Sequence, residues 1–211
     1  MPLWEHELKN AYIWEMPPID LLTDIVFYYS MEWNLNDDWP SGFNLNVTTG
    51  SYTGATNWIE TSSSFGATNT SATYPTNSSV TTTIWMNWTG WLYLGSDNYS
   101  WWGMNTELQS SWSWVYVVVG WRQFWATQNT SLSWWNMITG VFDYSAHTVT
   151  YYQNWNLITS TSTNSWWLRW GVVIGIWWAS SKIWITFVTA NAMTQAEIQK
   201  FYNASKGIYW L

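Results

Sequence analysis

The chain has 211 residues, a formal net charge of -7 and only six basic side chains. Charged residues make up 9% of it, against about a quarter in ordinary soluble domains, whereas 21% are aromatic and 24 are Trp. The few, scattered basic residues exclude the phosphate-binding patch of a nucleic-acid-binding protein, and the lack of cysteine excludes disulfides and thiolate metal sites.

The N-terminal residues carry acids where a secretion signal needs basic residues and then an apolar stretch, so no export signal is predicted. The longest apolar stretch, residues 170–179, falls well short of the roughly 20 residues that span a bilayer. We therefore expect no membrane span. The length suits one domain with a sizeable core, and we predict a single domain over residues 1–211.

Most of the chain has the composition of β-strands. Residues 80–88, 114–121, 147–155 and 182–188 are rich in β-branched and aromatic side chains, which fit the pleated surface of a sheet. Turns are predicted between them, at residues 37–42, 74–79, 95–98 and 159–165. The polar stretch 54–79 is expected to form surface loops around a short strand, with a linker as the alternative. This pattern predicts an all-β fold, a two-sheet antiparallel β-sandwich of the jelly-roll type.

A short helix is predicted near the C-terminal end, in residues 193–204. Thr194 and Glu197 have the T-x-x-E spacing of a capping box. Ile198, Phe201 and Tyr202 follow at helical spacing and form one apolar stripe. Because so short a helix is marginal by itself in water, we expect it to dock on the sheets.

The C-terminal motif resembles the closing segment of laminin-G-like jelly rolls, which belong to the concanavalin A-like superfamily. Those domains end with a strand, a short link and a helix of the form A-L-[ST]-x-x-E-I-x-x-L-Y. The matching positions here, without a gap, are Ala192, Met193, Thr194, Glu197, Ile198, Phe201 and Tyr202. The resemblance implies a helix that packs beside two sheets after the last strand.

Two other segments are similar to the same family. Residues 114–121 resemble its W-x-x-V-A-V strand, and residues 150–159 stand where it has L-Y-V-N-G-x-x-V. In this chain Asn154 is followed by Trp155 rather than Gly. The tight turn expected there must therefore be made differently.

The chain has more large apolar side chains than a sandwich of its size is expected to bury. A two-sheet sandwich of this length offers roughly 40 inward-pointing strand positions, and Trp, Tyr and Phe alone number 24, 13 and 7. Neighbouring Trp residues on a strand would also send one indole to each face. We therefore expect some rings to face outward and to contact a ligand or another subunit. The candidates are Tyr99, Trp101, Trp102, Trp121, Arg122, Trp134, Trp135, Trp166, Trp167, Trp177 and Trp178.

Three explanations for the outward rings remain open. Neighbouring subunits would cover them, a sugar would stack on them, or the chain's own loops and an enlarged core would shelter them. The low charge favours assembly, because a free monomer normally relies on charge for solubility.

No catalytic motif is predicted. A retaining glycanase needs two carboxylates on one strand, and the only E-x-E here is formed by Glu5 and Glu7 near the N-terminus. His6 and His147 form neither a zinc motif nor a catalytic triad. We therefore expect a protein that is not an enzyme and needs no cofactor.

Metal binding and glycosylation have weaker signals. Asp37, Asp38 and Asp97 are weak candidates for calcium, although capping of their own turns explains them as well. Seven N-x-[ST] sequons are candidate glycosylation sites if the chain meets an extracytoplasmic transferase. They begin at Asn46, Asn69, Asn77, Asn87, Asn98, Asn129 and Asn203.

These observations favour a structural and adhesive subunit of an external assembly, such as a virion coat, spike or surface filament. Its partners would be other copies of the chain or neighbouring coat proteins, at the virion or extracellular surface. The alternative is a carbohydrate-binding, lectin-like module. Its stacking platform would comprise Tyr99, Trp101, Trp102, Trp134 and Trp135.

Overall fold

The computed structural model describes the chain from residue 18 to residue 206 with gaps. The described residues are 18–31, 34–36, 38, 40, 42–54, 58–62, 65–69, 78–88, 92–97, 104–111, 114–119, 122–127, 135–162, 174–179 and 181–206. For the strands within residues 92–127 and 174–179, only the backbone is described.

The described residues form fifteen strands, one 3₁₀ helix and one α-helix. In chain order the elements are η1 (Ile19–Leu21), β1 (Ile25–Tyr29), β2 (Asn46–Thr49), β3 (Tyr52–Gly54), β4 (Ile59–Thr61), β5 (Phe65–Asn69), β6 (Val80–Trp88), β7 (Leu92–Asp97), β8 (Met104–Ser111), β9 (Trp114–Val119), β10 (Arg122–Thr127), β11 (Trp135–Asp143), β12 (Thr148–Gln153), β13 (Asn156–Ser162), β14 (Ile174–Ala179), β15 (Ser181–Thr189) and α2 (Gln195–Lys206). No helix in this described part is long and apolar enough to cross a membrane.

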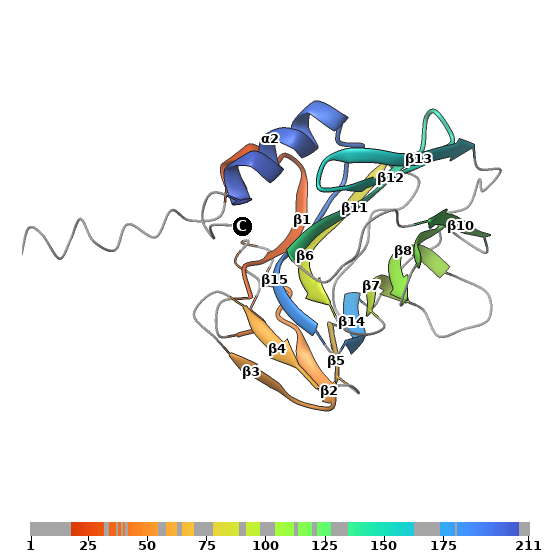
Figure 1. Ribbon diagram of the computed structural model, residues 1–211. Coiled ribbons are helices and arrows are strands. Elements are labelled where there is room, and N and C mark those ends of the chain that lie inside the picture. The colour runs from red at the N-terminus through yellow and green to blue at the C-terminus, as the bar shows by residue number, and fades with distance from the viewer. Residues whose placement is uncertain are drawn as a thin grey trace, which may run out of the picture.

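The strands form two antiparallel sheets that pack face to face (Figure 1). Sheet A has eight strands in the order β13-β12-β11-β6-β15-β4-β3, and β1 also pairs with β15. Sheet B has seven strands in the order β10-β9-β8-β7-β14-β5-β2. The predicted two-sheet β-sandwich with a C-terminal helix is therefore confirmed. That residues 1–211 make a single domain stays a prediction.

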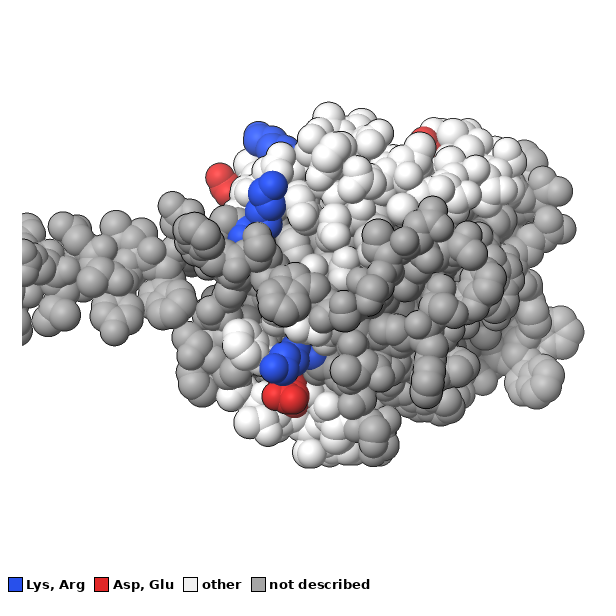
Figure 2. Space-filling model, viewed as in Figure 1, with Lys and Arg blue, Asp and Glu red and all other residues white. Residues whose placement is uncertain are grey.

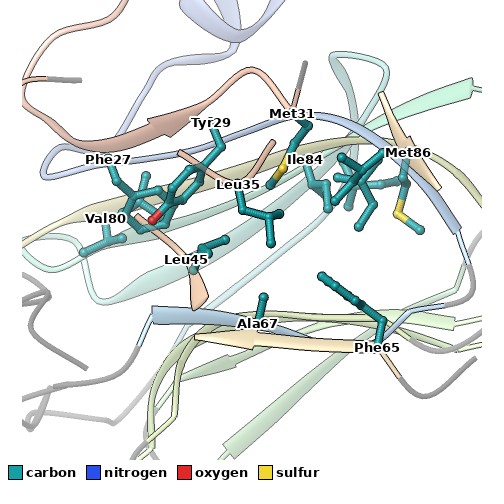
Figure 3. Close-up of a cluster of buried hydrophobic side chains, with 14 of the residues drawn as sticks. Phe27, Tyr29, Met31, Leu35, Leu45, Phe65, Ala67, Val80, Ile84 and Met86 are labelled. Atoms are coloured by element: carbon teal, nitrogen blue, oxygen red, sulfur yellow. The ribbon is translucent and has the colours of Figure 1, made fainter. Parts of the chain in front are cut away.

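The space between the sheets holds the first hydrophobic core. Phe27 and Tyr29 of β1 and Ile84 of β6 point from sheet A toward Phe65 and Ala67 of β5 in sheet B (Figure 3). Side chains alternate between the two faces of a strand. Val80, Ile84 and Met86 of β6 therefore enter this core, whereas Trp85 between them faces the other side of sheet A.

The outer face of sheet A holds a second core beneath helix α2 (Figure 1). Trp85 and Trp184 are buried there with ring centroids 5.7 Å apart. Tyr202 of the helix stacks on Trp85 at 5.4 Å, and the Trp85 indole N–H donates to Ser205 Oγ at 3.0 Å. The predicted docking of the helix is therefore confirmed.

The cap of the helix also forms as the sequence predicts. The backbone N–H of Thr194 donates to Glu197 Oε2 at 2.7 Å. The backbone N–H of Glu197 donates to Thr194 Oγ1 at 3.3 Å. Each side chain thus satisfies a backbone donor that the first helical turn leaves unpaired.

Two predicted turns are wrong because strands extend into them. Strand β7 continues through Asp97, where residues 95–98 were expected to turn. Strand β13 continues through Ser162, inside the predicted turn at 159–165. In β13 the Ser and Thr side chains pair across strands, as the 2.9 Å contact between Thr150 Oγ1 and Ser160 Oγ shows. Similarly, the stretch 54–79 contains two strands, β4 and β5, where one was expected.

The turn between β12 and β13 is made without glycine. Gln153 pairs with Asn156, so the loop consists of Asn154 and Trp155, and both have positive φ angles, 48° and 65°. Positive φ at both positions is the signature of a type I′ hairpin turn. The Asn154 side chain supports it, because its Oδ1 accepts the backbone N–H of Met137 at 2.8 Å.

The second core changes the expectation about outward-facing indoles. The described Trp side chains are Trp58, Trp85, Trp135, Trp155 and Trp184. Two of them are buried and three are half-buried, because α2 and the strand ends cover the outer face of sheet A. Within the described residues the exposed large hydrophobic side chains are Val47 and Leu157, at 44% and 51%. In this part of the chain helix α2 therefore covers Trp85 and Trp184, and the contact of other surplus rings with a ligand or another subunit stays a prediction.

Candidate functional site

Most of the predicted contact residues fall where side chains are not described. Outside the described residues lie Tyr99, Trp101, Trp102, Trp121, Trp134, Trp166 and Trp167. Arg122 lies in β10, and Trp177 and Trp178 lie in β14, where a bulge between Trp177 and Ala179 interrupts the pairing with β5. Trp135 is the member of the predicted contact set whose side chain is described.

Trp135 belongs to a row of side chains on the outer face of sheet A. It pairs with Asn87 of β6, Asn87 pairs with Lys182 of β15, and Lys182 pairs with Glu60 of β4. Residues directly opposite each other on neighbouring strands share a face. Trp58 lies two residues before Glu60 and packs on the same outer core as Trp135. We call these five residues the Trp58–Trp135 patch.

The two indoles of the patch meet edge to face. Their ring centroids are 5.9 Å apart with an interplanar angle of 62°, a favoured geometry for aromatic pairs. The Lys182 ammonium lies over the Trp58 ring, 5.5 Å from its centroid, within range of a cation–π interaction. These contacts hold three large side chains in defined positions at the surface.

The patch combines apolar ring surface with polar groups. Trp58, Trp135, Asn87 and Lys182 are half-buried, and Glu60 is exposed. Within a few strand spacings the sheet therefore presents indole faces, an amide, an ammonium and a carboxylate. This mixture suits a ligand with one apolar face and a rim of hydroxyl groups, which is the chemistry of a sugar ring.

The described part of the chain carries little charge. Figure 2 shows few charged side chains among the described residues on the face in view, and in one place a basic and an acidic group adjoin. The other described basic side chains, Lys200 and Lys206, belong to helix α2, where the Lys206 ammonium lies 5.1 Å from the Tyr202 ring centroid. Lys182 is therefore the one described cation of the patch.

The structure gives one explanation for a calcium candidate. Asp38 Oδ2 accepts the backbone N–H of Ser30 at 2.7 Å, so this carboxylate bonds to the chain just after β1 rather than capping its own turn. Asp37 lies outside the described residues, and of Asp97 the backbone in β7 is described. Within the described residues no three potential metal-ligating side chains gather.

The sequons fall in different environments. Asn46 and Asn203 are exposed, and Asn87 is half-buried in β6. Asn69 is 8% exposed and its Nδ2 donates to the backbone carbonyl of Asn44 at 2.8 Å. In the folded structure this amide nitrogen is buried and hydrogen-bonded, which makes Asn69 a less accessible acceptor than Asn46 or Asn203. Outside the described residues lie Asn77, Asn98 and Asn129.

Sequence reasoning missed four residues of the patch. Trp58, Glu60 and Lys182 were not candidates, and Asn87 was one only as a sequon. A weak signal existed, since Trp58 and Glu60 stand two residues apart and so share a face of a strand. Their partners come from distant strands, β6, β11 and β15, which the local sequence does not specify.

The comparisons with known proteins give information about the fold of this chain only. No family model matches the chain, and no curated protein matches it. Among solved structures, the binding domain of botulinum neurotoxin DC in complex with SialylT has a TM-score of 0.63 at 11% identity, covering 87% of this chain and 52% of that one. The botulinum neurotoxin serotype G binding domain has a TM-score of 0.61 at 13% identity, covering 84% and 50%.

Two further neighbours concern the same toxins. One is a structure of type C, whose cell entry depends on interaction with two ganglioside molecules, with a TM-score of 0.62 at 13% identity and 85% coverage of this chain. The other is the DC binding domain in complex with rat synaptotagmin II, also at 0.62 and 11% identity. This chain spans about half the length of these binding domains. The similarity extends to the fold, a mostly antiparallel β jelly roll with one C-terminal helix.

Proposed function

We propose that this chain is a non-enzymatic, lectin-like carbohydrate-binding module that holds a sugar ring on the Trp58–Trp135 patch. The observation that carries the proposal is the edge-to-face pair of half-buried indoles beside Asn87, Glu60 and Lys182. The apolar face of a sugar would lie on the exposed indole surface, and its hydroxyl groups would bond to the amide, carboxylate and ammonium.

The solved structures support this reading at the level of fold. Their domains bind a sialyl ligand, gangliosides and a protein receptor. Because this chain corresponds to about half of each domain, those ligands are not carried over to it. The resemblance of the C-terminal helix to that of laminin-G-like jelly rolls supports the same proposal.

The test is binding of the full chain to immobilised and soluble oligosaccharides, with Trp58→Ala and Trp135→Ala as variants. Loss of a central aromatic contact is expected to weaken binding about tenfold or more, which corresponds to about 1.4 kcal/mol. Tyr144→Ala is the matched control, because Tyr144 is a half-buried ring beyond the opposite end of β11. Equal affinities for all three variants, with folding verified by thermal melting, would reject the patch.

Assembly with other copies is a second candidate function, supported by strand β13. It is a seven-residue edge strand of sheet A, without charge or proline, and it exposes Leu157. Natural proteins usually protect such edges with Lys, Pro or a cover. Two copies of β13 pairing antiparallel about a twofold axis would continue sheet A from one molecule into the next.

This second reading would suit a structural and adhesive subunit at a virion or extracellular surface, with other copies or coat proteins as neighbours. Size-exclusion chromatography with light scattering tests it. A dimer or larger oligomer is expected for the wild-type chain, and Leu157→Lys should shift it toward the monomer. A wild-type chain that stays monomeric at every concentration excludes assembly through this edge.

A further inference from the structure

We infer that the Trp58–Trp135 patch selects neutral sugars over sugars that carry a carboxylate, such as sialylated glycans. This inference rests on the proposed function and names the ligand class of the same patch. It follows from how the charges of the patch are arranged and from the charge of the whole chain.

The single described cation of the patch is already engaged. The Lys182 ammonium lies over the Trp58 ring at 5.5 Å, and Lys182 stands directly opposite Glu60 in the pairing of β15 with β4. Opposite residues of an antiparallel pair have Cβ atoms roughly 5 Å apart. A ligand carboxylate that approached Lys182 would therefore also approach the Glu60 carboxylate.

The net charge of the chain also disfavours a ligand that carries a carboxylate. The chain has 13 acidic and six basic residues and a net charge of -7. A negatively charged ligand is repelled by such a surface, and the repulsion weakens as salt screens it. Like charges placed against a wrong ligand are a common way in which proteins gain specificity.

The same polar groups suit uncharged hydroxyl groups. The Glu60 carboxylate accepts hydrogen bonds, the Lys182 ammonium donates them, and the Asn87 amide does both. A hydroxyl group also donates and accepts, so a neutral sugar satisfies each of these groups without a net charge. The indoles of Trp58 and Trp135 supply the apolar surface for the ring.

The experiment compares lactose with sialyllactose, which share a core and differ by one charged residue. Affinities of the full chain are measured by calorimetry at low and at high ionic strength. Lactose is expected to bind at least tenfold more tightly at low salt, and the ratio is expected to fall as salt is added. Glu60→Gln should raise the affinity for sialyllactose relative to lactose severalfold.

Asp20→Asn is the control for net charge, since Asp20 is an exposed carboxylate in η1, outside the patch. It changes the net charge by the same amount as Glu60→Gln and should leave the ratio of the lactose affinity to the sialyllactose affinity nearly unchanged. Sialyllactose binding as tightly as lactose, or equal ratios in the two variants, overturns this inference while the carbohydrate-binding proposal stands. Binding of neither sugar, nor of any glycan on an array, overturns both.

Discussion

Trp155 shows how a single residue departs from the pattern expected for its turn. Its φ of 65° lies in the left-handed region, which costs a residue with a side chain about 1–2 kcal/mol relative to glycine. Its ring nevertheless packs, half-buried, against the outer core. The residue therefore combines backbone strain with side-chain packing, and substitution separates the two effects.

We predict that Trp155→Ala destabilises the protein more than Trp155→Gly. Both variants lose the packing of the half-buried indole, roughly 2 kcal/mol, which is about half the cost of removing a fully buried ring. Only the glycine also relieves the strain, by about 1 kcal/mol. Urea denaturation of the two variants measures the difference. An alanine variant as stable as the glycine variant would contradict a left-handed conformation at this position.

A second prediction concerns Asp143 and the pH dependence of the protein's stability. Its Oδ1 accepts the backbone N–H groups of Ser145 and Ala146 at 2.9 and 3.0 Å. The hydrogen bond from Ala146 is the main reason that the pKa of Asp143 is lowered below 3.8; burial opposes it, and the hydrogen bonds from Ser145 and Ser79 add to it. The folded pKa thus lies below the unfolded one.

The contribution of this carboxylate is therefore complete above the unfolded pKa and is lost as the pH falls through the folded pKa. We predict that Asp143→Asn lowers stability at pH 6 by less than about 1 kcal/mol, because the side chain is only half-buried and solvent screens it. The difference from wild type should shrink below pH 3.8. Thermal melts of both proteins across this range measure it, and a difference independent of pH would contradict the assignment.

At the scale of elements, helix α2 is the part that the sequence specifies most completely. Its cap and its stripe form as predicted, and Phe201 is buried with its ring 4.8 Å from that of Phe187. Strand β13 is the contrasting case. Its Ser- and Thr-rich sequence was predicted to turn, but pairing with β12 holds it extended.

We predict that Phe201→Ala destabilises the protein by about 3–5 kcal/mol, since it leaves a cavity between the helix and sheet A. Lys200→Ala at the neighbouring exposed position is the control and should change stability by less than about 0.5 kcal/mol. Guanidinium denaturation gives both values. Equal losses of stability in the two variants would mean that the helix does not dock through Phe201.

At the scale of the whole molecule, sheet A forms a middle layer. It is buried on one side by sheet B and on the other by α2, whereas strands at its edges are exposed. Strands β6, β11 and β15 are paired with neighbours along much of their length and are mostly buried. Strands β2 and β13 lie at sheet edges, and β2 is exposed throughout.

We therefore predict that backbone amides of β6, β11 and β15 exchange with solvent most slowly, and those of β2 and β13 fastest. Hydrogen exchange followed by mass spectrometry or NMR tests this order. Similar protection in β13 and β6 would indicate that another molecule covers the β13 edge, which would support assembly through it.

Sequence patterns alone were enough to predict the strands rich in β-branched and aromatic residues, the capped helix and the two-sheet class. These features depend on spacing along the chain, such as the i, i+3 and i+4 stripe of Ile198, Phe201 and Tyr202, and spacing is local information. The sequence also shows directly that the chain is unusually rich in aromatic residues. The inference that the surplus rings contact a partner stays a prediction.

The positions of the described rings depend on contacts between distant segments, which the local sequence does not specify. Helix α2 covers the outer face of sheet A and makes a second core, which buries Trp85 and Trp184. Strand β4 pairs with β15, and β15 pairs with β6, which brings Trp58 and Lys182 beside Trp135. These pairings join segments more than 40 residues apart, and their energy comes from burial and hydrogen bonds that exist only once the sheets have formed.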